Sequence, residues 1–330
     1  MITFIVTTYN LDDWLIRRCL NSIVAQGLLR DEYEIIVVDD ESEVSPQYVV
    51  DEFTTKANIF LYVQKHARQG AARNLGLRHA KGDWVQFVDG DDYLFANTIK
   101  PCLALVEAHQ LDLLMFAFRE VRDEKPMSLP CEIKKGLLSS ITTGNDYMLK
   151  NNLFGACWAQ LFSRQLLEES QFGVPLRFAE GVYIEDEEFV TKLVWRAQRM
   201  ARVDTPVYAY YQRNDSTVHS RSSERTNELF RNYFIVLERL LDFESSLVEM
   251  SHGGVTRKIR FLAVDILRRA LREPDWKVRW RQSVSQLFAL RLYPIPVANY
   301  SCKYRTFRLL AQSGIGRRIL RMCENKNVIR

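Results

Sequence analysis

The chain has 330 residues, a mass of 38.6 kDa and a formal net charge of +4. Hydrophobic residues make up 47% and charged residues 26%, an ordinary globular composition that excludes a disordered, collagen-like or low-complexity chain. The length exceeds the roughly 250–300 residues that one hydrophobic core supports, so we expect one large domain and an additional region. Charge is unevenly divided: residues 1–250 carry 27 Lys and Arg against 37 Asp and Glu, and residues 251–330 carry 18 against 4. The two parts should therefore face different partners.

The predicted elements alternate short apolar runs with amphipathic stretches in the first part of the chain. Short buried strands joined by helices imply a mostly parallel sheet with helices on both faces. From residue 223 onward the pattern is helical, and we place a domain boundary after residue 222. In chain order we expect strand 2–7, helix 12–26, strand 34–38, strand 59–63, helix 71–80, strand 84–88, strands 113–118 and 156–162, helix 185–199 and strand 207–211.

Six widely spaced cysteines include no CxxC pair, which argues against a zinc site and against a disulfide framework. The first apolar stretch has no basic segment before it and is broken by Thr7, Asn10 and Asp12, so we do not expect a signal peptide. No window approaches the ~18 consecutive apolar residues of a membrane-spanning helix. We therefore expect a cytoplasmic protein.

Polar turns follow three of the predicted strands. Ligands of parallel sheets bind beyond the carboxyl ends of the strands, so these turns are the places to look for a site. The turns are Thr8-Tyr9-Asn10, Asp39-Asp40-Glu41-Ser42 and Asp89-Gly90-Asp91-Asp92.

The turn at residues 89–92 places several carboxylates close together, where they repel one another unless a cation or hydrogen-bond donors neutralise them. Oxygen ligands favour Mg²⁺ or Mn²⁺ over zinc. The alternative is a solvated turn, because Asp and Gly are common turn residues.

Asp39 could accept a hydrogen bond from the ring N–H of a base such as uracil, or it could form an Asx turn or a helix cap. Arg73 is expected in the first turn of its helix, where a cation opposes the helix dipole and a bound diphosphate would relieve the conflict. A solvated arginine is the alternative. Asp186 precedes apolar residues of its helix by three and four positions and should face the sheet, whereas Glu187 should point away. An acidic first turn that only complements the helix dipole is the alternative there.

Four motifs occur in order: TYN after the first strand, VVDDxS after the second, QGAARNLGLRHAKGDWVQFVDGDD, and EDEEF. Together they resemble the inverting family-2 glycosyltransferases of the GT-A fold, over residues 1 to about 220. One departure is Val44, which stands where many members have Asp. The segment 211–216 is similar to a loop that often follows the last strand of the family, and His219 could contact metal or phosphate.

The resemblance implies an α/β GT-A catalytic domain at residues 1–222 and a basic helical region at 223–330. It also implies a divalent metal, Mg²⁺ or Mn²⁺, and a catalytic base, for which Glu185 is the second candidate. The implied site residues are Thr8, Tyr9, Asp39, Arg73, Asp89 and Asp92 for the nucleotide sugar, Asp89 and Asp91 for the metal, and Asp186 as the base.

The function implied by the resemblance is inverting transfer of a sugar, a hexose or N-acetylhexosamine, from a nucleotide-diphosphate sugar, most simply a UDP-sugar. The acceptor would be a hydroxyl of a saccharide, lipid-linked in the common bacterial case, during synthesis of capsule, exopolysaccharide or O-antigen. A nucleotidyltransferase and a non-catalytic assembly factor are the alternatives. A dinucleotide-binding dehydrogenase is excluded because TTYNLDD lacks glycine.

The last part of the chain has ten Lys and Arg and no acidic residue between Asp275 and Glu324, interleaved with aromatic residues. Such helices suit an anionic membrane surface, so we expect peripheral attachment to the inner face of the membrane. A solvated helical cap whose aromatic residues pack on the catalytic domain is one alternative, and a nucleic-acid surface, which we do not expect, is the other.

Overall fold

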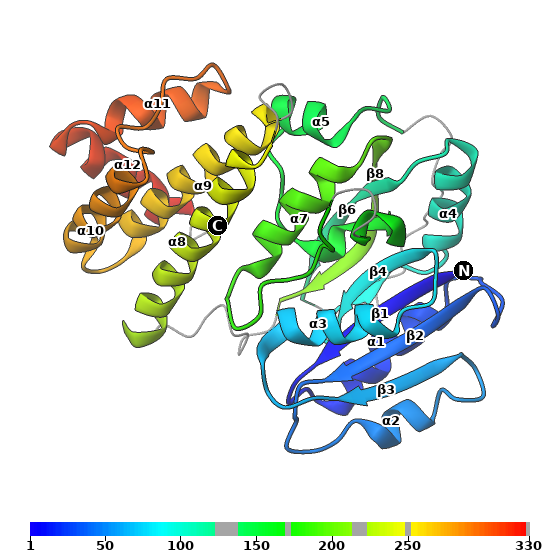
Figure 1. Ribbon diagram of the computed structural model, residues 1–330. Helices are drawn as coiled ribbons and strands as arrows, with labels where there is room; N and C mark the ends of the chain where they lie inside the picture. Colours follow the sequence, from blue (N-terminus) through cyan, green and yellow to red (C-terminus); the bar gives the residue numbers. More distant parts are fainter. Residues whose placement is uncertain (123–137, 169–172, 213–222, 248–251, 328–330) are drawn as a thin grey trace. The chain divides into compact units, whose positions relative to one another are not determined.

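The structure, a computed structural model, divides into two compact units (Figure 1). The first comprises residues 1–144 and 154–222, and the second comprises residues 145–153 and 223–330. The second unit thus takes in a short segment from the middle of the chain that the sequence pattern did not indicate. The described residues are 1–122, 138–168, 173–212, 223–247 and 252–327.

The first unit is built on one eight-stranded sheet with the order β3-β2-β1-β4-β7-β6-β8-β5. Strands β3, β2, β1 and β4 pair in parallel with one another in that order, and β6 pairs in parallel with β8. Strand β7 is antiparallel to β4 and β6, and β5 is antiparallel to β8. The expected mostly parallel α/β sheet is confirmed. The strands are β1 Ile2–Thr8, β2 Tyr33–Asp39, β3 Ile59–Val63, β4 Trp84–Asp89, β5 Tyr93–Leu94, β6 Leu113–Val121, β7 Gln160–Ser163 and β8 Met200–Tyr211.

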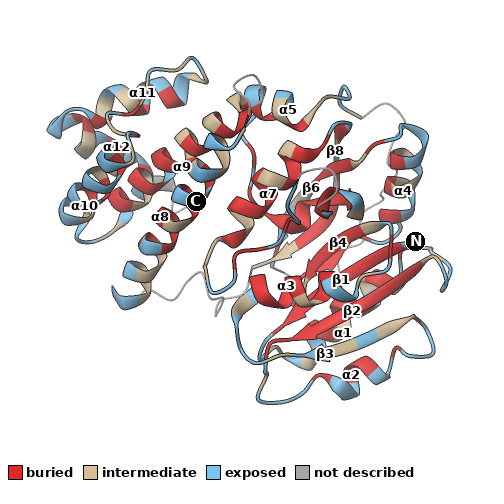
Figure 2. Ribbon diagram, in the orientation of Figure 1, coloured by how far each residue is buried: buried red, intermediate tan, exposed pale blue. Residues whose placement is uncertain are grey.

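Strands β1 and β2 are buried along their whole length, whereas β3 is partly exposed (Figure 2). Their continuous apolar runs, without alternation, are typical of parallel strands covered on both faces. Helix α3, Arg68–His79, packs on β1 and β2. Its closest approach uses Gly76, where a Cβ would lie 2.4 Å from Cγ2 of Ile5. A larger residue would push the helix away from the sheet.

The predicted elements of the first unit are largely present, with differences at their ends. Helix α1, Asp13–Val24, and helix α7, Glu185–Arg196, are shorter than predicted, and β6 and β8 are longer. The run at 156–162 begins as a 3₁₀ turn at Cys157–Ala159 before β7. The sequence analysis did not predict strand β5 or the helices α2 Gln47–Asp51 and α4 Ile99–Ala108, because their sequence patterns are short. For the same reason it did not predict helix α5, Gly144–Lys150, most of which belongs to the second unit.

The second unit is helical. Helices α8, α10 and α12 each contact α9, and α11 contacts α12. Glu324 of α12 is buried between Arg268 and Arg272 of α9, with Oε1 2.6 Å from Nε of Arg268 and Oε2 2.5 Å from Nη2 of Arg272. Arg257 donates to the carbonyl of Leu149, which attaches the inserted segment 145–153 to α9. The helices are α8 Ser223–Ser245, α9 Gly253–Arg272, α10 Trp276–Ala289, α11 Cys302–Ala311 and α12 Gly314–Asn327.

The interleaved aromatic residues of this unit differ in burial. Trp280, Tyr304 and Phe307 are buried, Trp276, Tyr293 and Tyr300 are half-buried, and Phe288 is 67% exposed. Only part of the aromatic set that suggested a membrane face thus belongs to the core of the helical unit. Among the described residues, no helix is both long enough and apolar enough to cross a bilayer.

Candidate active site

Three polar turns meet at one edge of the sheet. Strand β1 lies between β2 and β4, and the register pairs Thr8 with Asp39 and Thr7 with Asp89. The strands therefore end at the same level, which places the turns beginning at residues 8, 39 and 89 side by side. The predicted meeting of these strand ends is confirmed.

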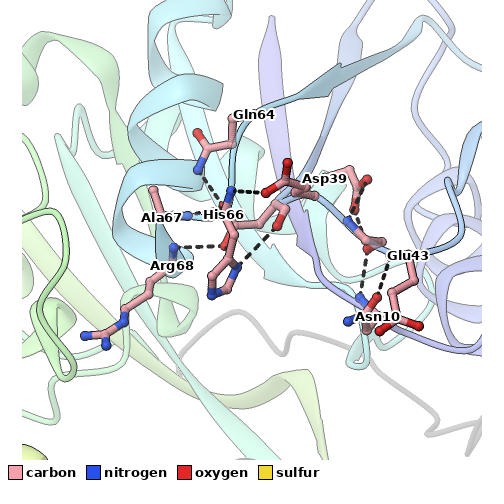
Figure 3. A network of polar contacts seen from close by, with 10 residues as sticks. Asn10, Asp39, Glu43, Gln64, His66, Ala67 and Arg68 are labelled. Atoms are coloured by element: carbon pink, nitrogen blue, oxygen red, sulfur yellow. Dashed lines mark hydrogen bonds and ion pairs between the residues drawn. The ribbon is translucent and has the colours of Figure 1, made fainter.

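The first turn presents an aromatic face to solvent. Tyr9 is 44% exposed and stacks on His66, with ring centroids 4.4 Å apart and 30° between the planes. Behind it, the amide of Asn10 donates to Oγ of Ser42 at 2.8 Å, and Oδ1 of Asn10 accepts from the amide of Glu43 at 2.8 Å (Figure 3). Thr8 lies deeper, with its hydroxyl buried and without a hydrogen-bond partner among the described residues. This arrangement leaves one flat surface and one polar group for a ligand.

The carboxylate of Asp39 forms an Asx-type turn, one of the alternatives considered for it. Oδ1 accepts from the hydroxyl of Ser42 at 2.5 Å, and Oδ2 accepts from its amide at 3.3 Å. An ionised carboxylate has about four lone-pair sites, so these two bonds do not saturate Asp39. Its contact with a base stays a prediction.

Asp40, which the sequence analysis left without a role, organises the loop before α3. Its side chain is buried and accepts hydrogen bonds from Nε2 of Gln64 and the amides of Ala67 and Arg68, at 2.7, 2.9 and 2.9 Å. Nδ1 of His66 lies 2.9 Å from Oδ2 of Asp40 (Figure 3). The adjacent pair Asp39-Asp40 was the available signal, because successive residues at a strand end point to opposite sides.

Arg73 joins two of the motifs. The side chain is 3% exposed, Nη1 donates to Oε1 of Glu185 at 2.8 Å, and Nη2 donates to Oδ1 of Asp89 at 2.9 Å. Burial alone would lower the pKa of Arg73, but the surrounding acidic groups, Cys157, Asp89 and Glu185 foremost, raise that pKa well above its usual value. The guanidinium is therefore a permanent cation at the centre of the site.

The placement predicted for Arg73 was wrong in one respect. Helix α3 begins at Arg68, so Arg73 lies in the second turn. The conflict with the helix dipole is relieved by Asp89 and Glu185, and it needs no bound anion. Whether Arg73 also contacts a donor stays a prediction, although its Nε has no hydrogen-bond partner among the described residues.

The acidic turn after β4 separates into unlike carboxylates. Asp89 keeps a side-chain exposure of 16% and contacts Arg73. Asp92 is 1% exposed, and its two oxygens accept from the hydroxyl of Tyr208 and the amide of Tyr211, each at 2.7 Å. Burial and the negative charges of Asp91 and Asp89 raise the pKa of Asp92 well above its usual range. This geometry favours a positioning role for Asp92, which attaches the acidic turn to β8.

The backbone of Asp91 is also held in place. Nη2 of Arg18 donates to the carbonyl of Asp91 at 2.7 Å. The guanidinium of Arg18 lies 4.1 Å from the ring centroid of Tyr211 and 4.9 Å from that of Tyr93. Arg18 thus links helix α1 to the acidic turn, and aromatic rings pack around its guanidinium. No spacing in the sequence indicates this contact.

Helix α7 brings the acidic motif Glu185-Asp186-Glu187-Glu188 to the same place. It starts after Ile184, whose φ of +59° is rare for a β-branched residue and costs about 1–3 kcal/mol, a strain typical of functional sites. By exposed area the most buried acids of this turn are Glu185 and Glu188, while Asp186 and Glu187 are half-buried. The reason is pairing: Glu185 is neutralised by Arg73, and Glu188 by Lys192 at 2.5 Å. That Asp186 faces the sheet stays a prediction.

Asp186 has the electrostatic surroundings of a base. Burial, Glu185 and Glu187 raise the pKa of Asp186 well above its usual range, and Arg73 opposes them. A carboxylate with a raised pKa holds a proton more strongly once it accepts one. Glu185, the second candidate, is occupied by Arg73, which favours Asp186.

Residues 155–158 complete the site, and the sequence analysis found no motif there. A Cβ on Gly155 would lie 2.3 Å from the carboxylate carbon of Glu187, so any larger residue would require the Glu187 side chain to move. Cys157 is buried beside the same charges: burial raises the pKa of its thiol well above the usual value, and Arg73 opposes that shift. His219 and residues 213–216 of the segment 211–216 lie outside the described residues.

No group of three or more His, Cys, Asp or Glu side chains in the described part of the chain could by itself hold a metal ion. Mg²⁺ in phosphate sites commonly uses only one or two carboxylates together with substrate phosphates, so a smaller protein contribution is compatible with metal binding. The candidates are Asp89 and Asp91.

Comparison with known proteins agrees with this geometry. The family described as Glycosyl transferase family 2 matches residues 3–170. The poly(ribitol-phosphate) beta-N-acetylglucosaminyltransferase TarS of Staphylococcus aureus is 26% identical over 208 residues, which are 62% of this chain and 34% of TarS. This chain thus spans about a third of the length of that relative.

Two solved structures have the same fold. The structure of S. aureus TarS 1–349 in complex with UDP-GlcNAc has a TM-score of 0.67 and 21% identity, covering 98% of this chain and 88% of that one. The mannosyltransferase PcManGT from Pyrobaculum calidifontis, in complex with GDP-Man and Mn²⁺, has a TM-score of 0.54 and 17% identity, covering 97% and 86%. The four motifs, the GT-A sheet and the family match lead to one conclusion: the chain belongs to glycosyl transferase family 2.

Proposed function

We propose that the protein transfers a sugar from a UDP-sugar to a hydroxyl of a saccharide acceptor, with inversion at the anomeric carbon. The observation that carries this proposal is the bridge from Asp89 through Arg73 to Glu185, next to Asp186. It joins the acidic turn expected to hold a sugar diphosphate to the helix expected to supply the base. TarS, with the same fold, has been solved with UDP-GlcNAc, which supports a UDP-sugar as donor.

The nucleoside would lie against the first two turns. The exposed face of Tyr9, supported from behind by His66, suits stacking of a flat base. Asp39 retains unused lone pairs that suit the N–H of uracil. The buried hydroxyl of Thr8 is a further polar group at this position.

The acidic turn fits a divalent cation. Its donors are oxygens only, and burial together with the charges of Asp89 and Asp91 raises the pKa of neighbouring Asp92 and Tyr210. Asp89 and Asp91 would hold Mg²⁺ or Mn²⁺, the ion seen in PcManGT. Such an ion supplies a Lewis acid that offsets the charge of the departing diphosphate.

Asp186 would act on the acceptor. As the acceptor oxygen attacks the anomeric carbon, its proton passes to the Asp186 carboxylate, the new glycosidic C–O bond forms, and the bond to the nucleoside diphosphate breaks. Attack from the side opposite the leaving group inverts the carbon. One base is enough, so no second carboxylate at glycosidase spacing is required.

The test is turnover by the purified full chain. A panel of UDP- and GDP-sugars with Mn²⁺ or Mg²⁺ should give nucleotide release from at least one UDP-sugar, and Asp186→Asn should remove it. EDTA should abolish release by the wild-type protein. In a second assay with UTP or GTP and sugar 1-phosphates in place of the panel, release of pyrophosphate with formation of a nucleotide sugar would identify a nucleotidyltransferase. No turnover in either assay would favour an assembly factor.

We further propose that the acceptor is lipid-linked, as in surface-polysaccharide synthesis, and that the helical unit contacts an anionic membrane. Helix α12 exposes Ile315, Ile319 and Met322 at 74, 45 and 64%, spaced so that they share one face. Arg318 is exposed on the same helix. Apolar side chains beside cations suit an anionic interface, so this face takes the role first assigned to the aromatic residues.

Vesicle co-sedimentation of the full chain tests this attachment. Ile315→Asp with Ile319→Asp should reduce binding to vesicles containing phosphatidylglycerol at low salt, and Val278→Asp, at another exposed apolar position, should not. Truncation after residue 273 is unsuitable because it removes α10 and α12, which pack on α9. Equal binding by all three proteins would contradict the assignment.

A further inference from the structure

Four aromatic residues form a continuous cluster next to the proposed active site. Phe154 and Phe118 stack with centroids 5.4 Å apart and 15° between their planes. Trp158 stands edge-on to both, 5.0 Å from Phe118 and 5.9 Å from Phe154, and lies parallel to Tyr210 at 5.7 Å. We call Phe118, Phe154, Trp158 and Tyr210 the aromatic shelf.

The shelf is open to solvent on one side. Phe154 is 53% exposed, Phe118 and Tyr210 are half-buried, and Trp158 lies beneath them at 6%. Single exposed hydrophobic residues are ordinary on protein surfaces, but this ring continues a stacked layer that reaches the interior. The exposed face is therefore supported from below and held in one orientation.

The chain connects the shelf directly to the catalytic carboxylates. Phe154 and Trp158 flank Gly155 and Cys157, which lie against Glu187 and beside the charges of Arg73 and Asp186. On the other side, Trp158 stacks on Tyr208 at 4.3 Å, and the hydroxyl of Tyr208 donates to Asp92. A molecule lying on the shelf would thus have one end near the proposed base.

The chemistry of the shelf favours an uncharged ligand. Its four residues offer aromatic rings, an indole N–H and a phenol hydroxyl, and none of them is a cation that could pair with an anionic ligand. Hydroxyl-rich molecules also suit the Tyr210 hydroxyl, which can both donate and accept.

We propose that the aromatic shelf binds an uncharged, cyclic sugar residue of the acceptor, with the C–H face of the ring on Phe154, the exposed ring of the stack. The negative face of an aromatic ring attracts the weakly positive C–H groups of a pyranose, and a rigid ring matches a flat surface. An open-chain polyol phosphate, the kind of acceptor named for TarS, offers no rigid face and carries a charge on every unit. This inference rests on the proposed function and adds the chemical class of acceptor.

Ligand-observed saturation-transfer NMR on the full chain with UDP and Mg²⁺ tests the shelf. The probes are methyl β-glycosides of glucose, galactose and N-acetylglucosamine, with ribitol 5-phosphate as the anionic open-chain probe. At least one glycoside should bind through its ring C–H protons and more tightly than ribitol 5-phosphate. Phe154→Ala should weaken that binding about tenfold, the size of a lost aromatic stacking contact, and Phe154→Tyr should restore it.

The matched control is Phe60→Ala, which removes a 38% exposed phenylalanine from β3 of the same unit and should leave glycoside binding unchanged. UDP binding is measured in every sample. Absence of UDP binding in the wild type would contradict the proposed function itself. If UDP binds, the shelf alone is contradicted by tighter binding of ribitol 5-phosphate, by no glycoside binding, or by a Phe154→Ala variant that binds glycosides as the wild type does.

Discussion

The two halves of the sheet carry different kinds of side chain next to the candidate site. In β3-β2-β1-β4 all strands are parallel, and the turns at their shared edge carry carboxylates and hydroxyls. In β7-β6-β8-β5 the pairing is mixed, and this half of the sheet carries stacked aromatic rings next to the candidate site. Polar groups suit a phosphate-bearing donor and rings suit a sugar acceptor, so the difference indicates a division of labour within one sheet.

Besides the pairing of β4 with β7, buried side-chain contacts link the parallel half to α7 and to β8. Arg73 from the parallel half binds Glu185 of α7, and Tyr208 of β8 donates to Asp92 after β4. Both are buried, where an unpaired partner is costly. Substitutions at these contacts and within each half test the comparison.

The largest expected effect is that of Asp186→Asn. The amide keeps the shape of the side chain but cannot accept the proton, so turnover should fall by about 10²–10⁴-fold. Affinity for UDP in the parallel half should stay near that of the wild type. Steady-state kinetics with calorimetric UDP binding measures both, and a loss of UDP affinity equal to the loss of turnover would place Asp186 in donor binding.

The pH dependence follows from the same residue. The raised pKa of Asp186 predicts that activity falls, as the pH drops, at a higher pH than an ordinary aspartate would require. At pH values between the pKa of Asp186 in the unfolded chain and its higher pKa in the folded chain, the unfolded chain has lost this proton and the folded chain has kept it. Wild-type stability therefore decreases as the pH rises through that window. Asp186→Asn should therefore be more stable than the wild type at neutral pH and lose that advantage in acid, as thermal unfolding at several pH values would show.

Arg73→Met removes the first contact between the halves. It leaves Asp89 and the buried Glu185 without their cation, and the free energy of unfolding should fall by about 3–5 kcal/mol. Denaturant titration measures this loss. Arg17→Met, which breaks an exposed pair with Glu52, is the control and should change stability little. Equal losses in the two variants would show that the buried bridge is not structurally important.

Tyr208→Phe removes the second contact. The hydroxyl donates to Asp92 and also accepts from the amide of Asp89 at 3.0 Å, so two buried groups lose a partner. We expect a loss of about 1–3 kcal/mol in unfolding free energy. The apparent affinity for Mn²⁺, followed by activity, should also fall, because Asp89 belongs to the proposed metal site. An unchanged denaturation midpoint would contradict the role given to Tyr208.

The smallest expected effect is that of His66→Ala. Loss of the ring beneath Tyr9 should cost about 0.5–1.5 kcal/mol of donor binding, seen as a severalfold rise in KM for the UDP-sugar. KM for the acceptor should not change, because His66 lies in the parallel half. A change confined to acceptor KM would reverse the assignment of the two halves.

The parallel half of the sheet was predictable because the residues of its polar turns lie close to their strands in the sequence. Each strand is a continuous apolar run, and each polar turn follows its strand directly, so the register of β1, β2 and β4 brings the turns together. Arg73 was placed one turn wrong because helix ends are set by loop contacts, here the bonds from Asp40 to Ala67 and Arg68. In α7, periodicity did not single out Glu185, whose burial depends on its partner cation Arg73.

The amino-acid sequence by itself determined the α/β sheet, the order of the motifs and the carboxylates at the strand ends, because these depend on spacing between near neighbours. Only the tertiary structure decided which charges are paired, that Asp92 positions the turn, and that Phe118, Phe154, Trp158 and Tyr210 form one surface. Those residues come from three separate segments of the chain. Their contacts depend on strand order and on side-chain packing, which no local periodicity encodes.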